Sequence, residues 1–257
     1  MRVVVLGSGT SMGVPAMGCS CDVCTSSDPK DQRSRVAAVI DGGEGRRVLI
    51  DTPPELRLQL LAAEFRTVDA VLFTHDHADH THGIDDLRAI SLRTGELPVY
   101  GPADALERIT HRFDYIFNPA MVAPEGTSKP HLTTTTLEAG EVVEIAGFDV
   151  LPVAVSHGVM MVFGYRFGPF AYLTDVKSVP EDALALLRGV RVLVINALFE
   201  DPHPTHLSIP EAVEVAEAIG AEQTFLTHLT HRYSHRDLSE RLPDGVEPAY
   251  DGLTLTI

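Results

Sequence analysis

Short apolar runs rich in valine, isoleucine and leucine recur along the chain, and glycine, proline or aspartate bounds each of them. Runs of this length with these boundaries are typical of buried β-strands. The pattern predicts strands at residues 1–7, 36–40, 47–50, 70–73, 98–100, 142–145, 148–155, 162–167, 170–174, 190–195 and 223–227. The runs at 36–40 and 47–50 flank Asp41-Gly42-Gly43, which predicts a β-hairpin.

Helical periodicity appears between groups of these strands. It predicts helices at residues 54–63, 103–113, 181–187 and 209–219. Ser208 is a suitable N-cap for the last helix, with Pro210 and Glu211 in its first turn. Strands come first and then alternate with helices in each half, which predicts an α+β fold with four layers in the order α/β/β/α.

The chain shows no composition change that would divide it. Residues 118–130 carry three prolines and no clear period, so we expect a surface loop there. We find no interdomain linker, and we therefore expect a single domain over residues 1–257.

Composition and charge argue against two classes, membrane-spanning proteins and nucleic-acid-binding proteins. The 44% of hydrophobic residues suffice for a sizeable core, and no apolar run approaches the length that spans a bilayer. The N-terminal run lacks a signal-peptide cleavage site, so we expect a cytoplasmic protein without a membrane partner. The formal net charge of −16 argues against nucleic acid as a partner, since phosphate binding needs a basic surface.

The most informative motif is His75-x-His77-x-Asp79-His80, directly after the predicted strand at 70–73. Side chains at the carboxyl end of a buried strand sit on a rigid base and face the crevice there. His75 and His77 can converge on one metal ion, while Asp79 and His80 can face a second. A solvated polar turn is the alternative interpretation of this motif.

Three further residues stand in the same context. His157, Asp175 and His228 each follow an apolar strand. Taken alone, each is better explained as an ordinary core or loop residue. Their shared position with the first cluster favours a common metal site.

This set resembles the metallo-β-lactamase fold superfamily over nearly the whole chain. The resemblance implies that His75, His77 and His157 hold one metal ion and that Asp79, His80 and His228 hold the other. It further implies that Asp175 bridges both ions and that Asp51, at the end of Val48-Leu49-Ile50, supports the metal-binding loop from behind. Imidazoles and carboxylates without thiolate suit Zn²⁺, Mn²⁺ or Fe²⁺. Two such ions can lower the pKa of a shared water enough to supply hydroxide near neutral pH.

All three cysteines, Cys19, Cys21 and Cys24, fall within six residues, which does not suit a disulfide framework. Cys-x-Cys-x-x-Cys in this early loop resembles the PhnP-like cyclic-phosphate phosphodiesterases. In that group, a histidine three residues after the last active-site histidine completes a structural zinc site, which here implies His231. Free thiols or an iron–sulfur site are the alternatives.

The same relatives place one more histidine beside the substrate, and the matching position here is His206. It could protonate a leaving alkoxide or bind a phosphoryl oxygen. His203 is the neighbouring competitor. The remaining candidates, His82, His111, His131 and His235, have no such support.

The glycine-rich segment 7–13 follows a strand but does not predict a dinucleotide site. Its spacing is G-x-G-x-x-x-G, and Pro15 with the cysteines follows where a helix should begin. We expect these glycines to let the loop pass close to the metals.

The resemblance to the PhnP-like group implies a phosphodiesterase that hydrolyses a small, cyclic phosphate ester through hydroxide held by two metal ions, with His206, Asp175 and Asp79 in catalysis. We expect two Mn²⁺ or Zn²⁺ ions at the active site, one structural Zn²⁺, a small phosphate-ester substrate and a homodimer. A tRNA 3′-end endonuclease is a second possibility, but the basic arm of that enzyme is missing. A PqqB-like protein and a metal-binding protein without activity are the others.

Overall fold

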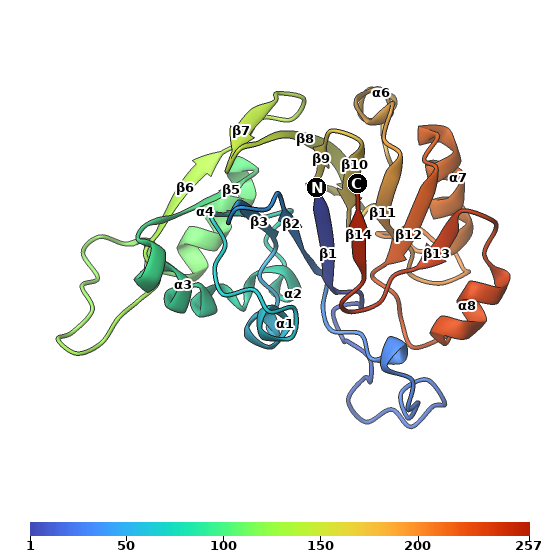
Figure 1. Cartoon of the computed structure of the whole chain (residues 1–257), viewed down its shortest axis with the longest axis horizontal. Coiled ribbons are helices and arrows are strands. Elements are labelled where there is room, and N and C mark those ends of the chain that lie inside the picture. The colour runs from blue at the N-terminus through green and yellow to red at the C-terminus, as the bar shows by residue number, and fades with distance from the viewer.

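Two seven-stranded sheets lie face to face, and helices cover the outer side of each (Figure 1). The computed structural model describes residues 1–257. The first sheet has the order β14-β1-β2-β3-β4-β5-β6. Its strands are β1 (Arg2–Gly7), β2 (Ala37–Asp41), β3 (Arg47–Ile50), β4 (Ala70–Leu72), β5 (Leu97–Gly101), β6 (Leu132–Thr136) and β14 (Thr254–Thr256).

The second sheet has the order β13-β12-β11-β10-β9-β8-β7. Its strands are β7 (Val143–Ile145), β8 (Phe148–His157), β9 (Met160–Phe167), β10 (Phe170–Leu173), β11 (Val192–Asn196), β12 (Gln223–Thr227) and β13 (Val246–Pro248). The α-helices are α1 (Leu56–Ala62), α2 (Ala78–Thr81), α3 (Leu87–Thr94), α4 (Ala103–Arg112), α5 (Asp114–Phe117), α6 (Glu181–Leu187), α7 (Ile209–Ile219) and α8 (His235–Arg241). Two 3₁₀ turns cover Pro29–Asp31 and Ile84–Asp86.

Successive side chains along each strand point to opposite faces of the sheet, and this alternation separates the core between the sheets from the core under the helices. In β1, Val3 and Val5 point between the two sheets, whereas Val4 and Leu6 point outward to the helices. The outer face of the first sheet packs against α1, α3, α4 and α5, and that of the second against α6, α7 and α8. The four-layer α/β/β/α sandwich expected from the sequence is confirmed.

The predicted elements are present with shifted ends. The expected hairpin forms as β2 paired antiparallel with β3, and its turn runs from Gly42 to Arg46. Ser208 caps α7, with a capping box in which Ser208 N donates to Glu211 Oε2 at 2.8 Å and Glu211 N donates to Ser208 Oγ at 3.4 Å. The helix expected at 54–63 is shorter, because Pro53 and Pro54 precede it and α1 begins only at Leu56.

Several short elements escaped the sequence prediction. The strand β6 has the sequence Leu-Thr-Thr-Thr-Thr with only Leu132 buried, so it shows no apolar run. Strands β13 and β14 have three residues each. Helix α8 buries only Leu238, which leaves its period too weak to detect. Tertiary pairing, rather than local pattern, defines these segments.

The glycine-rich segment does not lead into a helix. A Cβ at Gly9 would lie 2.5 Å from Arg33 O, and Gly9 forms bridges with both Arg35 and Leu229. The absence of a side chain therefore lets the loop run against the segment that follows His228. A dinucleotide-binding turn is excluded by this course of the chain.

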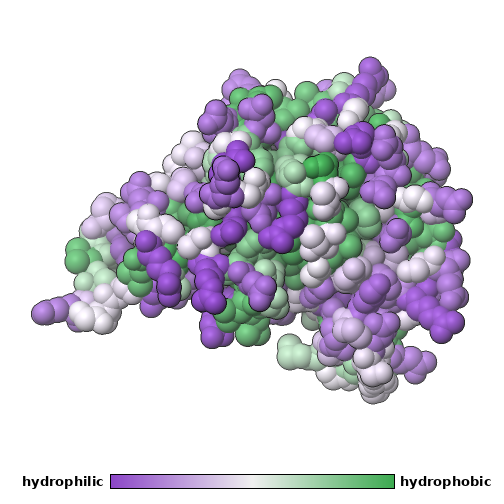
Figure 2. Space-filling view, in the orientation of Figure 1, coloured by the Kyte–Doolittle hydropathy of each residue, from purple (hydrophilic) through white to green (hydrophobic).

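Two loops project from the sandwich. Residues 118–130 have no helix or strand, as expected, and form the long loop at the left of Figure 1, while residues 10–36 form the loop at its lower edge. Both projections stand out in the space-filling view, where hydrophilic and hydrophobic residues are mixed on the left one (Figure 2). None of the helices has the length and apolar character that crossing a membrane requires.

Candidate metal centres

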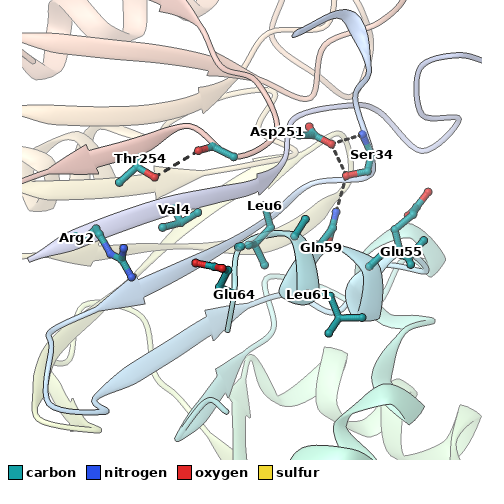
Figure 3. Close-up of a pocket in the computed structure, with 14 residues that line it drawn as sticks. Arg2, Val4, Leu6, Ser34, Glu55, Gln59, Leu61, Glu64, Asp251 and Thr254 are labelled. Carbon is teal, nitrogen blue, oxygen red and sulfur yellow. Dashed lines mark hydrogen bonds between the residues drawn. The ribbon is translucent and has the colours of Figure 1, made fainter. Parts of the chain in front are cut away.

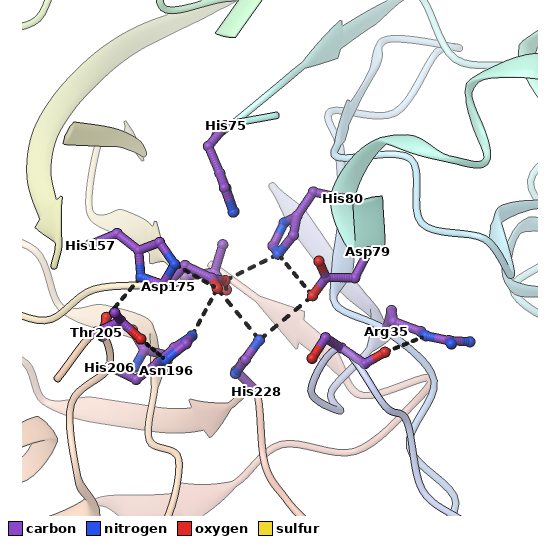
Figure 4. Close-up of polar contacts among 12 residues, drawn as sticks. Arg35, His75, Asp79, His80, His157, Asp175, Asn196, Thr205, His206 and His228 are labelled. Atoms are coloured by element: carbon purple, nitrogen blue, oxygen red, sulfur yellow. Dashed lines mark hydrogen bonds and ion pairs between the residues drawn. The ribbon is translucent and has the colours of Figure 1, made fainter. Parts of the chain in front are cut away.

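The candidate ligands come together where strands of both sheets end. Asp51 follows β3, His75 follows β4, His157 ends β8, Asp175 follows β10 and His228 follows β12. Figure 4 shows His75, His157 and His228, from three of these separate segments, pointing toward Asp175. The common strand-end position seen in the sequence therefore corresponds to a common place in the fold.

The first group consists of His75, His77 and His157. One nitrogen from each ring lies within 4.8 Å of the others. His75 and His157 are buried, whereas His77 stands at the N-cap of α2 and is half-buried. Three imidazoles gathered in this way form a set that suits a divalent ion.

The second group consists of Asp79, His80 and His228, again with ligand atoms within 4.8 Å of one another. Asp79 and His80 lie in the short helix α2. His80 Nε2 is 3.6 Å from Asp79 Oδ2, and His228 Nε2 is 4.0 Å from the same oxygen.

Asp175 stands between the two groups. Its Oδ2 is 3.2 Å from His80 Nε2, and its Oδ1 is 3.5 Å from His228 Nε2 and 4.0 Å from His157 Nε2. One carboxylate thus contacts histidines of both groups. This is the place that a bridging ligand would occupy.

The chemistry of the donor set fits cations. The Nε2 atoms of His75, His80 and His228 are buried and have no hydrogen-bond partner. Burial lowers the pKa of His75 well below its usual value and that of His228 to about 4, so both rings are neutral with free lone pairs. Burial also lowers the pKa of His80, but Asp175, Asp51 and Asp79 around it outweigh this and raise it well above its usual value. The pocket therefore combines a strongly negative potential with imidazole nitrogens that lack a hydrogen-bond partner. Two divalent ions would neutralise the carboxylates and bind these nitrogens.

Three residues of the site have left-handed backbone conformations. The φ angles are 62° at Asp51, 57° at Asp175 and 57° at His228. Such conformations cost about 1–3 kcal/mol each for residues other than glycine, and they concentrate at functional sites. The fold therefore holds these side chains in place against a local preference.

Asp51 is fully buried behind His80. It accepts hydrogen bonds from Thr74 N at 2.9 Å, from Thr74 Oγ1 at 2.8 Å and from His80 Nδ1 at 2.7 Å. The bond to Nδ1 leaves His80 Nε2 free to face the site. This is the supporting position expected from the sequence.

We expect Asp51→Asn to weaken active-site metal binding by about 10–100-fold, because the amide cannot accept all three hydrogen bonds. A competition titration with a fluorescent chelator measures the change. Asp244→Asn, at an exposed aspartate in the turn before β13, is the matched control. Unchanged affinity in Asp51→Asn would refute the supporting role.

Asp76 belongs to the same motif but points away from the metal groups. Its carboxylate accepts from Arg108 Nε at 3.1 Å and from Arg112 Nη2 at 3.0 Å, and Arg112 also donates to Asp76 O. Two arginines of α4 therefore hold the loop that carries the motif. The sequence did not indicate these arginines.

His206 lies at the edge of the site, and His203 lies behind it. His206 Nε2 is 3.0 Å from Asp175 Oδ1, and the ring stacks on His228 with centroids 4.7 Å apart. His203 contacts His206 and Phe199 but none of the metal-group residues. Of the two competing histidines, only His206 contacts the metal-group residues, and with His157 and Asp175 it forms a further group whose ligand atoms lie within 4.8 Å of one another.

The other histidines lie elsewhere. His82 packs on Phe113, His131 is 3.4 Å from Glu96, and His235 packs on Tyr250. They and His111, on α4, are absent from the groups that could hold a metal.

The three cysteines and His231 form a separate group. Their ligand atoms lie within 4.8 Å of one another, with His231 Nδ1 3.5 Å from Cys19 Sγ and 3.3 Å from Cys21 Sγ. The hydrogen bond with His231 lowers the pKa of Cys21 to about 6, which favours thiolate. Burial raises the pKa of Cys24 to about 11, so this thiol ionises readily only beside a cation. The donor set is that of a closed tetrahedral zinc site.

This group ties the loop at 10–36 to the segment after His228. Leu229 N donates to Ser8 O at 2.9 Å, and the buried Arg33 donates to Thr230 O and, at 3.0 Å, to Tyr233 O. A zinc ion bound by the cysteines and His231 would add a further link three residues from His228. The site would then help to fix the position of a catalytic-site ligand.

We expect Cys21→Ser to lose this structural ion and to lower the melting temperature by about 5–10 °C, as a loss of about 2–3 kcal/mol would in a chain of this size. Activity should fall by less than about tenfold, because Ser8 and Arg33 still hold the segment after His228. Calorimetry and zinc analysis measure both effects, with exposed Ser20→Ala as the control. An unchanged melting temperature and zinc content would contradict the assignment.

One hollow of the molecule lies apart from both metal groups. It measures about 740 Å³ and lies between α1 and the edge formed by β1 and β14 (Figure 3). Apolar side chains such as Val4, Leu6 and Leu61 line it, and a hydrogen-bonded chain of Asp251, Ser34 and Gln59 closes one end. None of the candidate ligands contributes to it.

Comparison with protein families identifies the fold. Residues 46–229 match the model of the β-lactamase superfamily domain. Among curated proteins, an octanoyltransferase from Porphyromonas gingivalis is 38% identical over the whole chain, but this chain spans only 52% of that protein. A ribonuclease Z from Pyrobaculum islandicum is 25% identical over 86% of this chain and 89% of its own length.

Solved structures agree with this grouping. A diphosphatase of the PhnP family is 38% identical with a TM-score of 0.91, covering 100% of this chain and 97% of the other. Zinc-bound PqqB from Methylobacterium extorquens has a TM-score of 0.80 at 20% identity and covers both chains completely. The human short-form tRNase Z has a TM-score of 0.72 at 20% identity and covers 100% and 99%. The last two likenesses concern the fold alone.

Proposed function

Since this chain belongs to the metallo-β-lactamase superfamily and is a hydrolase of that fold, we propose that it hydrolyses a phosphorus–oxygen bond in a small phosphodiester. A cyclic phosphate ester is the substrate we favour. The observation that carries the proposal is the convergence of seven ligand-type side chains beside His206, with unpaired buried nitrogens facing inward.

The residues divide the work of such a reaction. His75, His77 and His157 would hold one ion and Asp79, His80 and His228 the other, with Asp175 contacting both. When bound, two divalent ions would lower the pKa of a water and neutralise the charge that develops on the phosphoryl oxygens. His206, whose Nε2 lies 3.0 Å from Asp175 Oδ1, would give a proton to the leaving oxygen.

A second substrate class has support of its own. The solved structure at 38% identity is that of a diphosphatase of the PhnP family. A diphosphate linkage also contains a phosphorus with two bridging oxygens, so the same groups can act on it. A phosphate is a better leaving group than an alkoxide, so hydrolysis of a diphosphate would depend less on proton donation by His206.

Other readings have less support. The relatives named ribonuclease Z and PqqB are at most 31% identical where they match. An RNA substrate fits poorly with the net charge of −16. The octanoyltransferase name belongs to a protein of which this chain spans about half, so we propose no acyl transfer. A metal-binding role without turnover leaves the position of His206 unexplained.

We propose Mn²⁺ or Zn²⁺ at the active site, Zn²⁺ at the cysteines and a cytoplasmic homodimer, with the loop at 118–130 as part of the interface. Met121 and Val122 in this loop are exposed apolar residues. Deleting residues 120–126 should convert the dimer into a monomer in light scattering.

The function is tested by assaying protein loaded with Mn²⁺ or Zn²⁺ on four substrates. These are bis(4-nitrophenyl) phosphate, a ribose cyclic phosphate, adenosine 2′,3′-cyclic phosphate and a nucleoside diphosphate ester. Hydrolysis of at least one cyclic ester supports the favoured substrate class, and hydrolysis of the diphosphate alone supports the second. Turnover of none of them by loaded protein would refute the proposal.

A further inference from the structure

Thr205 contacts two histidines of the site at once, through different atoms. Its carbonyl oxygen accepts from His157 Nδ1 at 2.7 Å, which leaves His157 Nε2 facing the first metal group. Its hydroxyl lies 2.9 Å from His206 Nδ1. A Cβ on Gly158 would come within 2.9 Å of the Thr205 methyl group, so the turn after β8 packs tightly on this side chain.

The hydrogen positions in this network follow from its partners. His206 Nε2 faces the carboxylate oxygen Asp175 Oδ1 at 3.0 Å, so Nε2 carries a proton. His203 Nδ1 accepts from Thr205 N at 3.4 Å, so this nitrogen presents a lone pair rather than a proton; it also lies 3.3 Å from His206 Nδ1. Burial lowers the pKa of His203, with His206 and Lys177 adding to the effect, and the ring is therefore neutral.

The hydroxyl of Thr205 can then complete a directed chain. It donates to His203 Nδ1, 3.2 Å away, and its lone pair accepts from His206 Nδ1–H at 2.9 Å. In its doubly protonated, cationic form His206 gives up the proton on Nε2: that N–H bond breaks, an O–H bond forms on the leaving oxygen, and the ring becomes neutral with its one remaining proton on Nδ1. The Thr205 hydroxyl therefore accepts the hydrogen bond from His206 Nδ1–H both before and after the proton leaves Nε2.

We propose that Thr205 is the positioning residue for His206, and that His203 is the terminal acceptor that orients the Thr205 hydroxyl. This inference rests on the proposed phosphodiesterase function. Thr205→Val keeps the volume and the main-chain bond to His157 but removes the hydroxyl. Thr205→Ser restores the hydroxyl, and Ser178→Ala removes a different hydroxyl near the site as a control.

Two substrates with different leaving groups distinguish a loss of His206 positioning from a general loss of activity. A 4-nitrophenolate leaves without a proton, whereas the ring-opening alkoxide of adenosine 2′,3′-cyclic phosphate needs one. Thr205→Val should lower kcat on the cyclic nucleotide by about 10–100-fold and on bis(4-nitrophenyl) phosphate by less than about threefold, with metal content unchanged. Thr205→Ser and Ser178→Ala should stay close to wild type on both. An equal loss on both substrates, or a serine variant as poor as valine, overturns the proposal.

A second readout does not require turnover. In zinc-loaded protein labelled with ¹⁵N-histidine, the Nδ1 resonance of His206 should move in Thr205→Val and return in Thr205→Ser, while that of His157 stays in place. An unmoved His206 resonance overturns the inference even if the enzyme turns over neither substrate. Absence of turnover with the expected shifts contradicts the phosphodiesterase proposal instead.

Discussion

An Asp175→Ala variant is expected to lose both active-site ions and at least about 10³-fold in kcat/KM. The carboxylate contacts histidines of both metal groups, at 3.2 Å from His80 Nε2 and 3.5 Å from His228 Nε2. Although burial raises the pKa of Asp175, His228 and His80 outweigh it and hold that pKa well below the usual value, so the group is an anion at neutral pH. Without it, the two groups lose the only ligand they share.

Elemental analysis and steady-state assays on the same preparation measure the two losses together. The zinc at the cysteines should remain, because Cys19, Cys21, Cys24 and His231 form a separate group. Asp244→Ala, at an exposed aspartate in the turn before β13, is the control for a change of charge. Full metal content in Asp175→Ala would show that the carboxylate does not bridge.

Replacing His206 with alanine is expected to lower kcat by about 10²–10³-fold while both active-site ions are kept. The ring contacts Asp175 and stacks on His228 but is not needed to complete either group of three ligands. His203→Ala should lose less, because His203 contacts His206 and Thr205 but none of the metal-group residues.

Parallel assays of both variants on a cyclic ester, with metal content as the control, distinguish the two histidines. A greater loss in His203→Ala would reverse their roles. Loss of metal from His206→Ala would make it a ligand rather than a proton donor.

The active-site cluster was accessible from the sequence because its residues follow strands. His75, His157, Asp175 and His228 each come after an apolar run, and strand ends meet at one edge of a sheet. The four layers were predicted in the same way, because a buried strand forms an apolar run that can be recognised without knowing which strands it pairs with. The resemblance supplied the pairing of ligands into two groups.

The supporting residues were not accessible in this way. Arg33, Arg108 and Arg112 act across long sequence separations, and nothing local marks an arginine that will hold a distant loop. One signal was overlooked. Threonine directly precedes His75, Asp175 and His206, and each hydroxyl lies 2.7–2.9 Å from its neighbour's side chain. A small hydroxyl beside a ligand is a local feature that sequence reasoning can use.

The edge strands of the two sheets also could not be predicted from the local sequence pattern. Strands β6, β13 and β14 each bury only one residue, so their pairing depends on neighbours that the sequence does not identify. These strands lie at the rims of the two sheets, away from the site, and the missed elements did not affect the functional interpretation.

The central claim is that this chain holds two ions at the strand ends and one at the cysteines. Elemental analysis of protein incubated with Zn²⁺ or Mn²⁺ and then desalted tests it most directly. The account predicts close to three ions per chain, at least one of them zinc, falling to about one in Asp175→Ala. A single ion or none in the wild-type protein would contradict it.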